Sequence, residues 1–157
     1  MERDLRKWRR TEIFSHQCHQ RYRGRCAICR KGIRVLYFGL KKGDIIFLEG
    51  DLGAGKTTFT KGLAEAFGVK AQQVVSPTFV IMNHYDAKLP IYHFDLYRLK
   101  SNAELLDIGF EDYLIGTNYV FIEWPELSMT FITSAIKVEI KFENNIRYIY
   151  AQLIKTS

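Results

Sequence analysis

The chain has 157 residues, a length typical of one domain with its own core, and 47% of them are hydrophobic. No apolar run approaches the ~20 residues of a membrane span, and the first residues lack the apolar stretch of a secretory signal. We therefore expect a cytoplasmic protein that does not bind a membrane. The three cysteines are an odd number, which argues against a disulfide framework.

The net charge of +6 is unevenly distributed along the chain. Residues 1–42 carry a balance of +10, whereas residues 43–157 carry a balance of −4. All three cysteines also lie in the first part. The composition therefore predicts two segments: a basic leader bearing Cys and His, residues 1–39, and a mildly acidic body, residues 40–157.

The leader contains a C-x-x-C pair, which together with neighbouring side chains could supply four zinc ligands: Cys26, Cys29 and two from His16, Cys18 and His19. A zinc site on a basic arm would suit RNA binding, but a second pair with regular spacing is missing. Two further interpretations stay open. The arm is disordered with incidental cysteines, or the coding sequence is misread upstream of about residue 36.

The body opens with a phosphate-binding motif, G-x-x-x-x-G-K-[ST], which is complete in residues 50–57. It stands between a predicted strand, 45–49, whose residues 45–48 are apolar, and a segment of helical periodicity, 57–67. In this context the loop N–H groups and the start of the helix surround a polyphosphate. We expect Lys56 to reach the β- and γ-phosphates and the Thr57 hydroxyl to bind Mg²⁺. A glycine turn that binds nothing is the competing interpretation, and it leaves the complete motif unexplained. The expected nucleotide-binding residues are Gly50, Asp51, Leu52, Gly53, Ala54, Gly55, Lys56, Thr57 and Thr58.

The rest of the body reads as short strands with few helices. A capping-box pattern, Ser101 to Glu104, predicts a helix towards Asp107. Together these elements predict an α/β fold, a single P-loop NTPase domain with a mixed β-sheet flanked by helices. The other predicted elements are strands 79–85 and 91–96 joined by a turn at 86–90, a short helical piece 110–114, a buried strand 119–122, and a C-terminal hairpin of 136–142 and 146–153.

Two acidic residues are candidates for the chemistry at the phosphates. Glu123 directly follows the apolar run 119–122, at the place where a strand end points a carboxylate towards a γ-phosphate and its metal. Asp95 lies among aromatic residues in 92–98, and the pattern alone leaves it either solvent-facing or functional. His93 reads as a structural histidine, and Arg98 as a solvated side chain.

Four stretches of the body resemble the small bacterial ATPase of the tRNA threonylcarbamoyladenosine pathway, the TsaE or YjeE family. They are Gly50 to Phe59, Ser76-Pro77-Thr78-Phe79, Tyr92-His93-Phe94-Asp95-Leu96-Tyr97-Arg98-Leu99, and Glu123-Trp124-Pro125-Glu126. The order of these motifs in so short a chain is specific, and the resemblance covers about residues 40–155. Similarity resumes abruptly near Leu40, which favours a misread leader over a zinc site or a disordered arm.

The resemblance implies roles for individual residues. Lys56 and Thr57 match the phosphate and Mg²⁺ residues, Glu123 the Mg²⁺-associated catalytic glutamate, and Asp95 an acidic switch residue near the γ-phosphate. Trp124 matches a tryptophan beside the nucleotide site. Ser76 and Thr78 lie in a loop that the family also places near the nucleotide.

The resemblance also implies a function, with ATP and Mg²⁺ as cofactors. The family's ATPase is slow alone and resets a complex of two partner proteins, of TsaB and TsaD type, that modifies adenosine 37 of tRNA. Two different functions stay open. A small-molecule kinase would need several lid arginines, but residues 43–157 contain only Arg98 and Arg147. A zinc-bearing RNA-binding module would use the P-loop only as a nucleotide switch.

Overall fold

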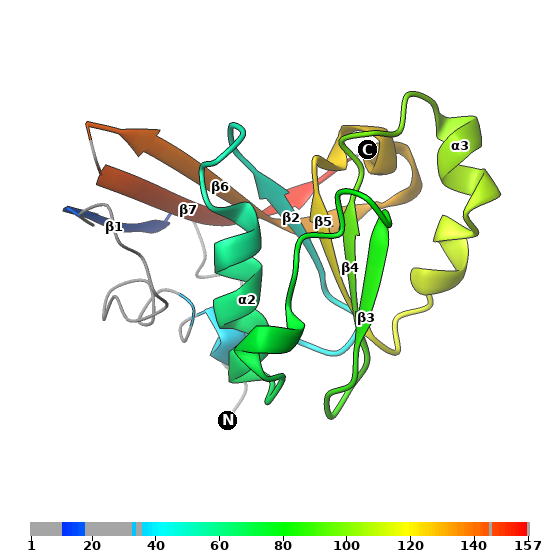
Figure 1. Ribbon diagram of the computed structural model, residues 1–157, viewed down its shortest axis with the longest axis horizontal. Coiled ribbons are helices and arrows are strands. Elements are labelled where there is room, and N and C mark those ends of the chain that lie inside the picture. The colour runs from blue at the N-terminus through cyan, green and yellow to red at the C-terminus, as the bar shows by residue number, and fades with distance from the viewer. Residues whose placement is uncertain (1–10, 18–32, 34–35, 145, 157) are drawn as a thin grey trace.

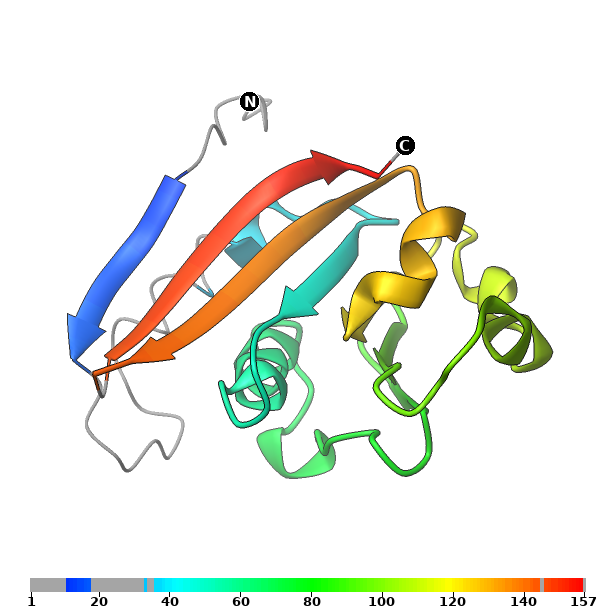
Figure 2. The same ribbon diagram turned by 90° about the horizontal axis from the view of Figure 1, so that it is seen from above.

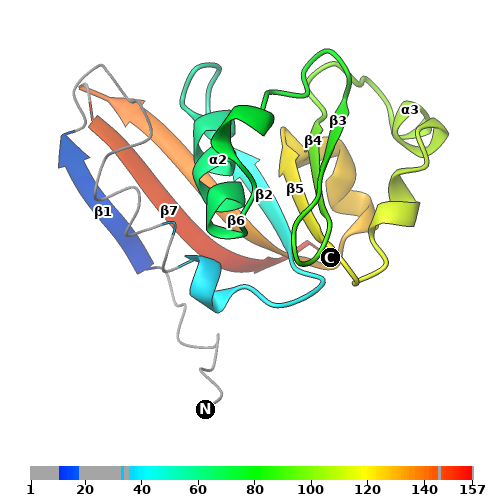
Figure 3. The ribbon, with the colours of Figure 1, turned by 60° about the horizontal axis from the view of Figure 1, so that its bottom comes forward.

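The computed structural model describes residues 11–17, 33, 36–144 and 146–156. Their strands form one seven-stranded sheet in the order β1-β7-β6-β2-β5-β4-β3, which can be followed across Figure 3. The pairs β6–β2, β2–β5 and β5–β4 at the centre are parallel, and the outer pairs are antiparallel. The predicted α/β fold with a mixed sheet is confirmed. The strands are β1 (Thr11–Gln17), β2 (Ile45–Glu49), β3 (Met82–Tyr85), β4 (Ile91–Asp95), β5 (Tyr119–Glu123), β6 (Ser134–Glu143) and β7 (Ile146–Lys155).

Helices cover both faces of the central strands (Figures 1 and 2). Alternate residues of β2 point to opposite faces: Ile46 and Leu48 pack with Leu63 of α2 (Lys56–Ala66), whereas Phe47 packs with Phe110 on the other face. The second face is covered by α3 (Asn102–Asp107) and by the 3₁₀ helices η3 (Phe110–Tyr113) and η4 (Pro125–Phe131). The double coverage explains why β2 and β5 are continuous apolar runs. No helix in the described part of the chain is long and apolar enough to cross a membrane.

Most predicted elements are present with boundaries shifted by one or two residues. The exception is the predicted strand 79–85, which was wrong at its start, because β3 begins only at Met82. The amides of Val80 and Ile81 donate to the carbonyl of Pro77, and Ile81 adopts a φ of 67°. This turn holds the preceding residues out of the sheet. The helix η4 was not predicted.

The helix α3 has the predicted N-cap, with one change in its hydrogen bonds. The amide of Glu104 donates to the Ser101 hydroxyl at 3.3 Å, as a capping box requires. The Glu104 carboxylate accepts from the amide of Lys100, one residue before the expected partner. The start of the helix was therefore predicted correctly.

Part of the predicted leader contributes to the fold. The strand β1 pairs antiparallel with β7, from Thr11 opposite Ala151 to Gln17 opposite Ile146, and forms one edge of the sheet. Residues 33 and 36–39 are helical, and Ile33 and Leu36 are buried in the same core as α2. The predicted zinc ligands Cys18, His19, Cys26 and Cys29 lie outside the described residues, and the side chain of His16 is not among those described.

Candidate nucleotide site

The phosphate-binding motif forms the loop between β2 and α2, at the carboxyl end of the parallel strands. The helix begins at Lys56, and Gly55 before it has a φ of 111°. With eleven residues, α2 directs a full helix dipole at the loop. Asp51, Leu52, Gly53 and Thr58 are exposed, Ala54 and Lys56 are buried, and Gly50, Gly55 and Thr57 lie between these extremes. The local context predicted for the motif is therefore confirmed.

Gly50 is the tightest point of this loop. Its φ is 147°, and a Cβ placed there would lie 2.4 Å from the backbone oxygen of Ile140. We expect Gly50→Ala to lower the free energy of unfolding by about 2–3 kcal/mol, because backbone would have to move. Gly53→Ala, where a Cβ meets no atom within 4 Å and only the φ of 79° is strained, should cost about 1 kcal/mol. Urea unfolding of the two variants checks this, and equal losses would contradict it.

The ammonium group of Lys56 lies inside the loop. It donates to the carbonyl oxygens of Gly50 at 2.6 Å and Asp51 at 3.0 Å, and it lies 4.0 Å from the centre of the Trp124 ring. Burial lowers the pKa of Lys56, and the nearby carboxylates, chiefly Glu123 and Asp95, partly offset this effect. A phosphate would offer this ammonium a stronger, charged partner than two carbonyl groups.

Glu123 ends β5, next to the end of β2, where Leu48 is its partner in the sheet register. The carboxylate is buried, with 3% of the residue exposed. Its Oε1 atom accepts a hydrogen bond from the Thr57 hydroxyl at 2.8 Å and lies 2.9 Å from Nε2 of His93. The predicted metal residue and the predicted catalytic glutamate are thus in direct contact, across 66 positions of sequence.

Asp95 is the register partner of Glu123 on the adjacent strand β4. It is 3% exposed, so the open question of its orientation is settled in favour of the inward position. Its carboxylate accepts from the Thr78 hydroxyl and, at 3.0 Å, from the amide of Tyr97. Thr78 is also hydrogen-bonded to Ser76 at 2.6 Å. The loop around Pro77 is therefore attached to the end of β4 beside Glu123.

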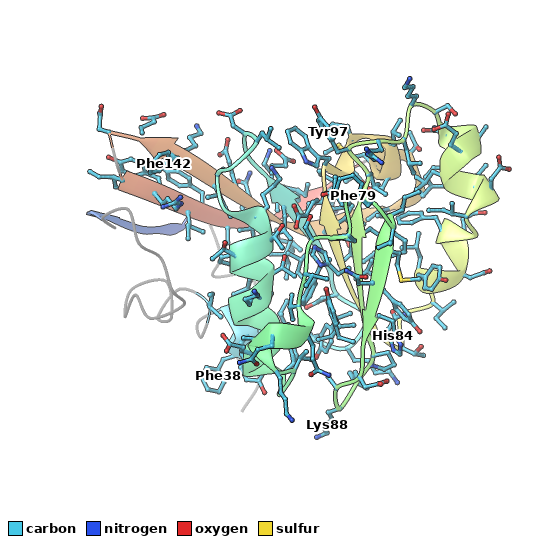
Figure 4. The ribbon with its side chains drawn as sticks, in the orientation of Figure 1. Phe38, Phe79, His84, Lys88, Tyr97 and Phe142 are labelled. Carbon is cyan, nitrogen blue, oxygen red and sulfur yellow. The ribbon has the colours of Figure 1, made fainter. Side chains whose placement is uncertain are left out.

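Trp124 directly follows Glu123 and adopts a φ of 57°, which is unusual for a residue with a large side chain. This conformation turns the indole towards the loop, where it meets Lys56 and lies 5.0 Å from the Tyr97 ring, centre to centre. Tyr97 and Phe79 lie at the same end of the molecule as the loop between β2 and α2, whereas His84 and Lys88 lie towards the other end (Figure 4). The Trp124 side chain therefore lies beside the phosphate-binding loop.

Sequence reasoning missed two residues of the site. Arg147 of β7 donates from Nε to the carbonyl of Ala54 at 2.9 Å, and its guanidinium lies 4.5 Å from the Phe142 ring centre. It also lines a small pocket beside the loop, with Ile33, Thr58 and Phe59. His93 contacts Glu123 directly. Neither contact has a local sequence signal, because each joins segments that are distant in sequence.

The oxygen atoms of the site fit the ligand preferences of a magnesium ion bound together with phosphates. Thr57 directs its hydroxyl hydrogen at Glu123, which leaves the oxygen lone pairs available to a metal. Oxygen ligands are those that Mg²⁺ prefers, and it commonly takes only one or two of them from the protein beside phosphates. No cluster of three or more His, Cys, Asp or Glu side chains capable of holding a metal by itself occurs among the residues that the structure describes.

Comparisons with known proteins identify the family of the chain. The chain matches the family described as "Threonylcarbamoyl adenosine biosynthesis protein TsaE" over residues 29–149. It resembles the crystal structure of Bacillus subtilis YdiB with a TM-score of 0.61 and 33% identity, over 78% of this chain and 76% of that one.

Proteins named tRNA threonylcarbamoyladenosine biosynthesis protein TsaE are similar in sequence. The one from Bacillus subtilis is 50% identical over 88 residues, 55% of this chain and 54% of that protein. The one from Rickettsia conorii is 41% identical over 115 residues, 73% of this chain and 65% of that protein. The chain thus spans between about half and two thirds of the length of these relatives. Its fold, its phosphate-binding loop and the family match over residues 29–149 agree, and the chain belongs to the TsaE family.

Proposed function

We propose that this protein is a Mg²⁺-dependent ATPase required for threonylcarbamoyladenosine formation at adenosine 37 of tRNA. The observation that carries the proposal is the hydrogen bond from Thr57 to the buried Glu123 carboxylate. It joins the phosphate-binding loop to an acidic strand end, which is the arrangement that phosphoryl transfer to water needs.

Each residue of the site has a proposed task. Lys56 would leave the carbonyls of Gly50 and Asp51 and bind the β- and γ-phosphates. Glu123 would orient the attacking water, because its buried carboxylate is held in one position by hydrogen bonds. Asp95 would respond to the γ-phosphate and pass the change to the Thr78 loop. A magnesium ion held by Thr57, with Glu123 nearby, would neutralise charge on the phosphates.

We further propose that the base of the nucleotide lies towards the pocket lined by Ile33, Thr58, Phe59 and Arg147. This pocket adjoins Gly55 and the start of α2, beside the loop that would bind the phosphates. Apolar walls with one planar cation suit an aromatic base.

The partner of this ATPase would be a two-protein complex of the TsaB and TsaD type, with tRNA reached through that complex. Exposed apolar side chains near the site support a protein partner there, namely Leu52 at 81%, Phe79 at 81%, Val80 at 64% and Tyr97 at 56% exposure. Hydrolysis would reset the complex for another cycle. We expect the isolated chain to be slow, because its site is completed by the partners.

The test is threonylcarbamoyladenosine formation on tRNA in a reconstituted reaction with the two partner proteins. We expect multiple turnover with the intact chain and at most a single turnover with Lys56→Ala. Equal product with the intact chain, the variant and no added chain would contradict the proposed role.

No observation favours a small-molecule kinase or a zinc-bearing RNA-binding module. Residues 43–157 contain only two arginines, Arg98 and Arg147, fewer than the several that a kinase lid would need. The zinc module depends on residues outside those described. Zinc content of the purified chain tests it directly.

Trp124 should report nucleotide binding. When ATP draws the Lys56 ammonium away from the indole, the environment of Trp124 changes, so we expect a shift or change in intensity of its emission. The chain has only two tryptophans, and Trp8→Phe leaves Trp124 as the sole tryptophan. An ATP titration of that variant measures the effect, and Trp124→Phe should remove it. Unchanged emission at saturating ATP would contradict the displacement of Lys56.

A further inference from the structure

His93 is a fully buried polar side chain for which the proposed chemistry has no assigned task. It lies on β4 between β3 and β5, with none of its surface exposed. Its Nε2 lies 2.9 Å from Oε1 of Glu123, and its Nδ1 lies 3.2 Å from the hydroxyl of Tyr85. Both ring nitrogens therefore have a partner, one of which is the proposed catalytic carboxylate.

In this series of contacts, the donor of each hydrogen bond follows from which groups can donate and which can only accept. An ionised carboxylate only accepts, so Nε2 of His93 must carry the hydrogen that it shares with Glu123. In the neutral ring, Nδ1 is then an acceptor, and the Tyr85 hydroxyl at 3.2 Å is the donor beside it. Burial raises the pKa of Tyr85, so this hydroxyl keeps its proton. The Glu123 carboxylate thus selects the tautomer of His93, and a hydrogen bond from Tyr85 to Nδ1 is compatible with it.

The Tyr85 hydroxyl has a second acceptor beside it, the carbonyl of Val75 at 3.2 Å. This carbonyl also accepts from the amide group of Asn83 at 3.1 Å. Because a carbonyl oxygen can accept two hydrogen bonds, Val75 and Nδ1 of His93 share the single hydrogen of the hydroxyl. Val75 lies directly before the loop of Ser76 and Thr78. The series of contacts from Val75 through Tyr85 and His93 to Glu123 therefore crosses the strands β3, β4 and β5.

The contacts also orient the carboxylate. Thr57 and His93 both bind the same oxygen of Glu123, Oε1. Among the described residues, no hydrogen bond reaches Oε2. Two donors on one oxygen fix the plane of the carboxylate and leave Oε2 for a water. A histidine kept only for packing would not need to place its donor on this oxygen.

We propose that His93 is a positioning residue for Glu123, which it orients through a hydrogen bond from its Nε2 atom to Oε1. The role deepens the proposed ATPase function and rests on it. Without this donor, the Glu123 side chain is held by Thr57 alone and samples other rotamers. The misplacement of a catalytic group by about 1 Å can cost on the order of 100-fold in rate.

Two substitutions of His93 separate positioning from packing. His93→Gln can place an amide N–H near the site of Nε2 and reach Glu123. His93→Asn is shorter and can pair only with Tyr85. We expect kcat for partner-stimulated ATP hydrolysis to fall by roughly 10–100-fold in His93→Asn and by less than about 3-fold in His93→Gln, with KM for ATP unchanged in both.

The matched control is His84→Asn on β3, because His84 is exposed and lies away from the site (Figure 4). It should leave kcat unchanged. Thermal unfolding of all variants shows whether activity follows stability. Equal kcat in His93→Asn and the intact chain, or losses in His93→Asn and His93→Gln that only follow their melting temperatures, would overturn the positioning role.

A second measurement does not depend on activity. Nitrogen-15 NMR of the imidazole rings, with His93 assigned by its loss in His93→Gln, should show a ring protonated at Nε2. Tyr85→Phe should leave Nε2 protonated, because the Glu123 carboxylate still accepts there. Hydrolysis by the intact chain with an Nε2-deprotonated His93 would overturn the positioning role alone. No hydrolysis with partners present, together with an Nε2-protonated ring, would overturn the proposed function instead.

Discussion

Glu123→Gln is expected to lower kcat for ATP hydrolysis by about 10²–10⁴-fold, the range lost when a general base is removed. The glutamine has the same shape and can still accept from Thr57 and His93, so the site should stay assembled. It cannot orient and polarise water as an anion can. Steady-state hydrolysis with partner proteins measures the loss, and nucleotide affinity should change little.

The matched control for this substitution is Glu65→Gln, which removes an exposed carboxylate from α2. It should retain full activity. A Glu123→Gln variant that turns over at the rate of the intact chain would remove Glu123 from the catalytic role.

Lys56→Ala should weaken ATP binding by at least about 100-fold, because charge-assisted hydrogen bonds to phosphate contribute on the order of 3 kcal/mol. The free energy of unfolding of the nucleotide-free variant should not fall by a comparable amount. Burial lowers the pKa of Lys56, which means that the folded state holds the charged form at a cost. The same shift predicts a pH dependence. The free energy of unfolding of the intact chain should rise with pH between the lowered pKa of Lys56 in the folded state and its ordinary pKa in the unfolded state. Lys56→Ala should lack this rise.

Calorimetric titration with ATP measures the affinity, and urea unfolding as a function of pH measures the stability. Lys61→Ala, on the same helix and partly exposed, is the control and should bind ATP normally. Unchanged affinity in Lys56→Ala would mean that the ammonium remains with the carbonyls of Gly50 and Asp51 when ATP binds.

Local patterns predicted the parts of the site that lie in contiguous sequence. The loop 50–57 could be predicted because its conformation depends on its own residues. Gly50 and Gly55 have positive φ angles, which glycine readily adopts, and the helix begins at Lys56. Glu123 was recognised because a buried strand is visible as an apolar run and its end can be located in the sequence. The same reasoning failed at 79–81, where apolar residues form a turn instead of a strand.

The orientation of Asp95 could not be predicted from local patterns. Its aromatic surroundings were compatible with either face of the strand, and only the register with Glu123 and the bond from Thr78 decide that it faces the site. The strand β1 is a similar case, because its pairing with β7 joins residues more than a hundred positions apart.

By itself, therefore, the sequence determined the class of fold, the phosphate-binding loop and the two acidic candidates, since each depends on backbone conformation or burial within a few consecutive residues. Three sets of contacts were visible only in the tertiary structure. They are the hydrogen bond from Thr57 to Glu123, the contacts of His93 with Glu123 and Tyr85, and the hydrogen bond from Arg147 to Ala54. These contacts depend on the order in which strands pair, which is set by the packing of the whole core and leaves no periodic signal in any one segment.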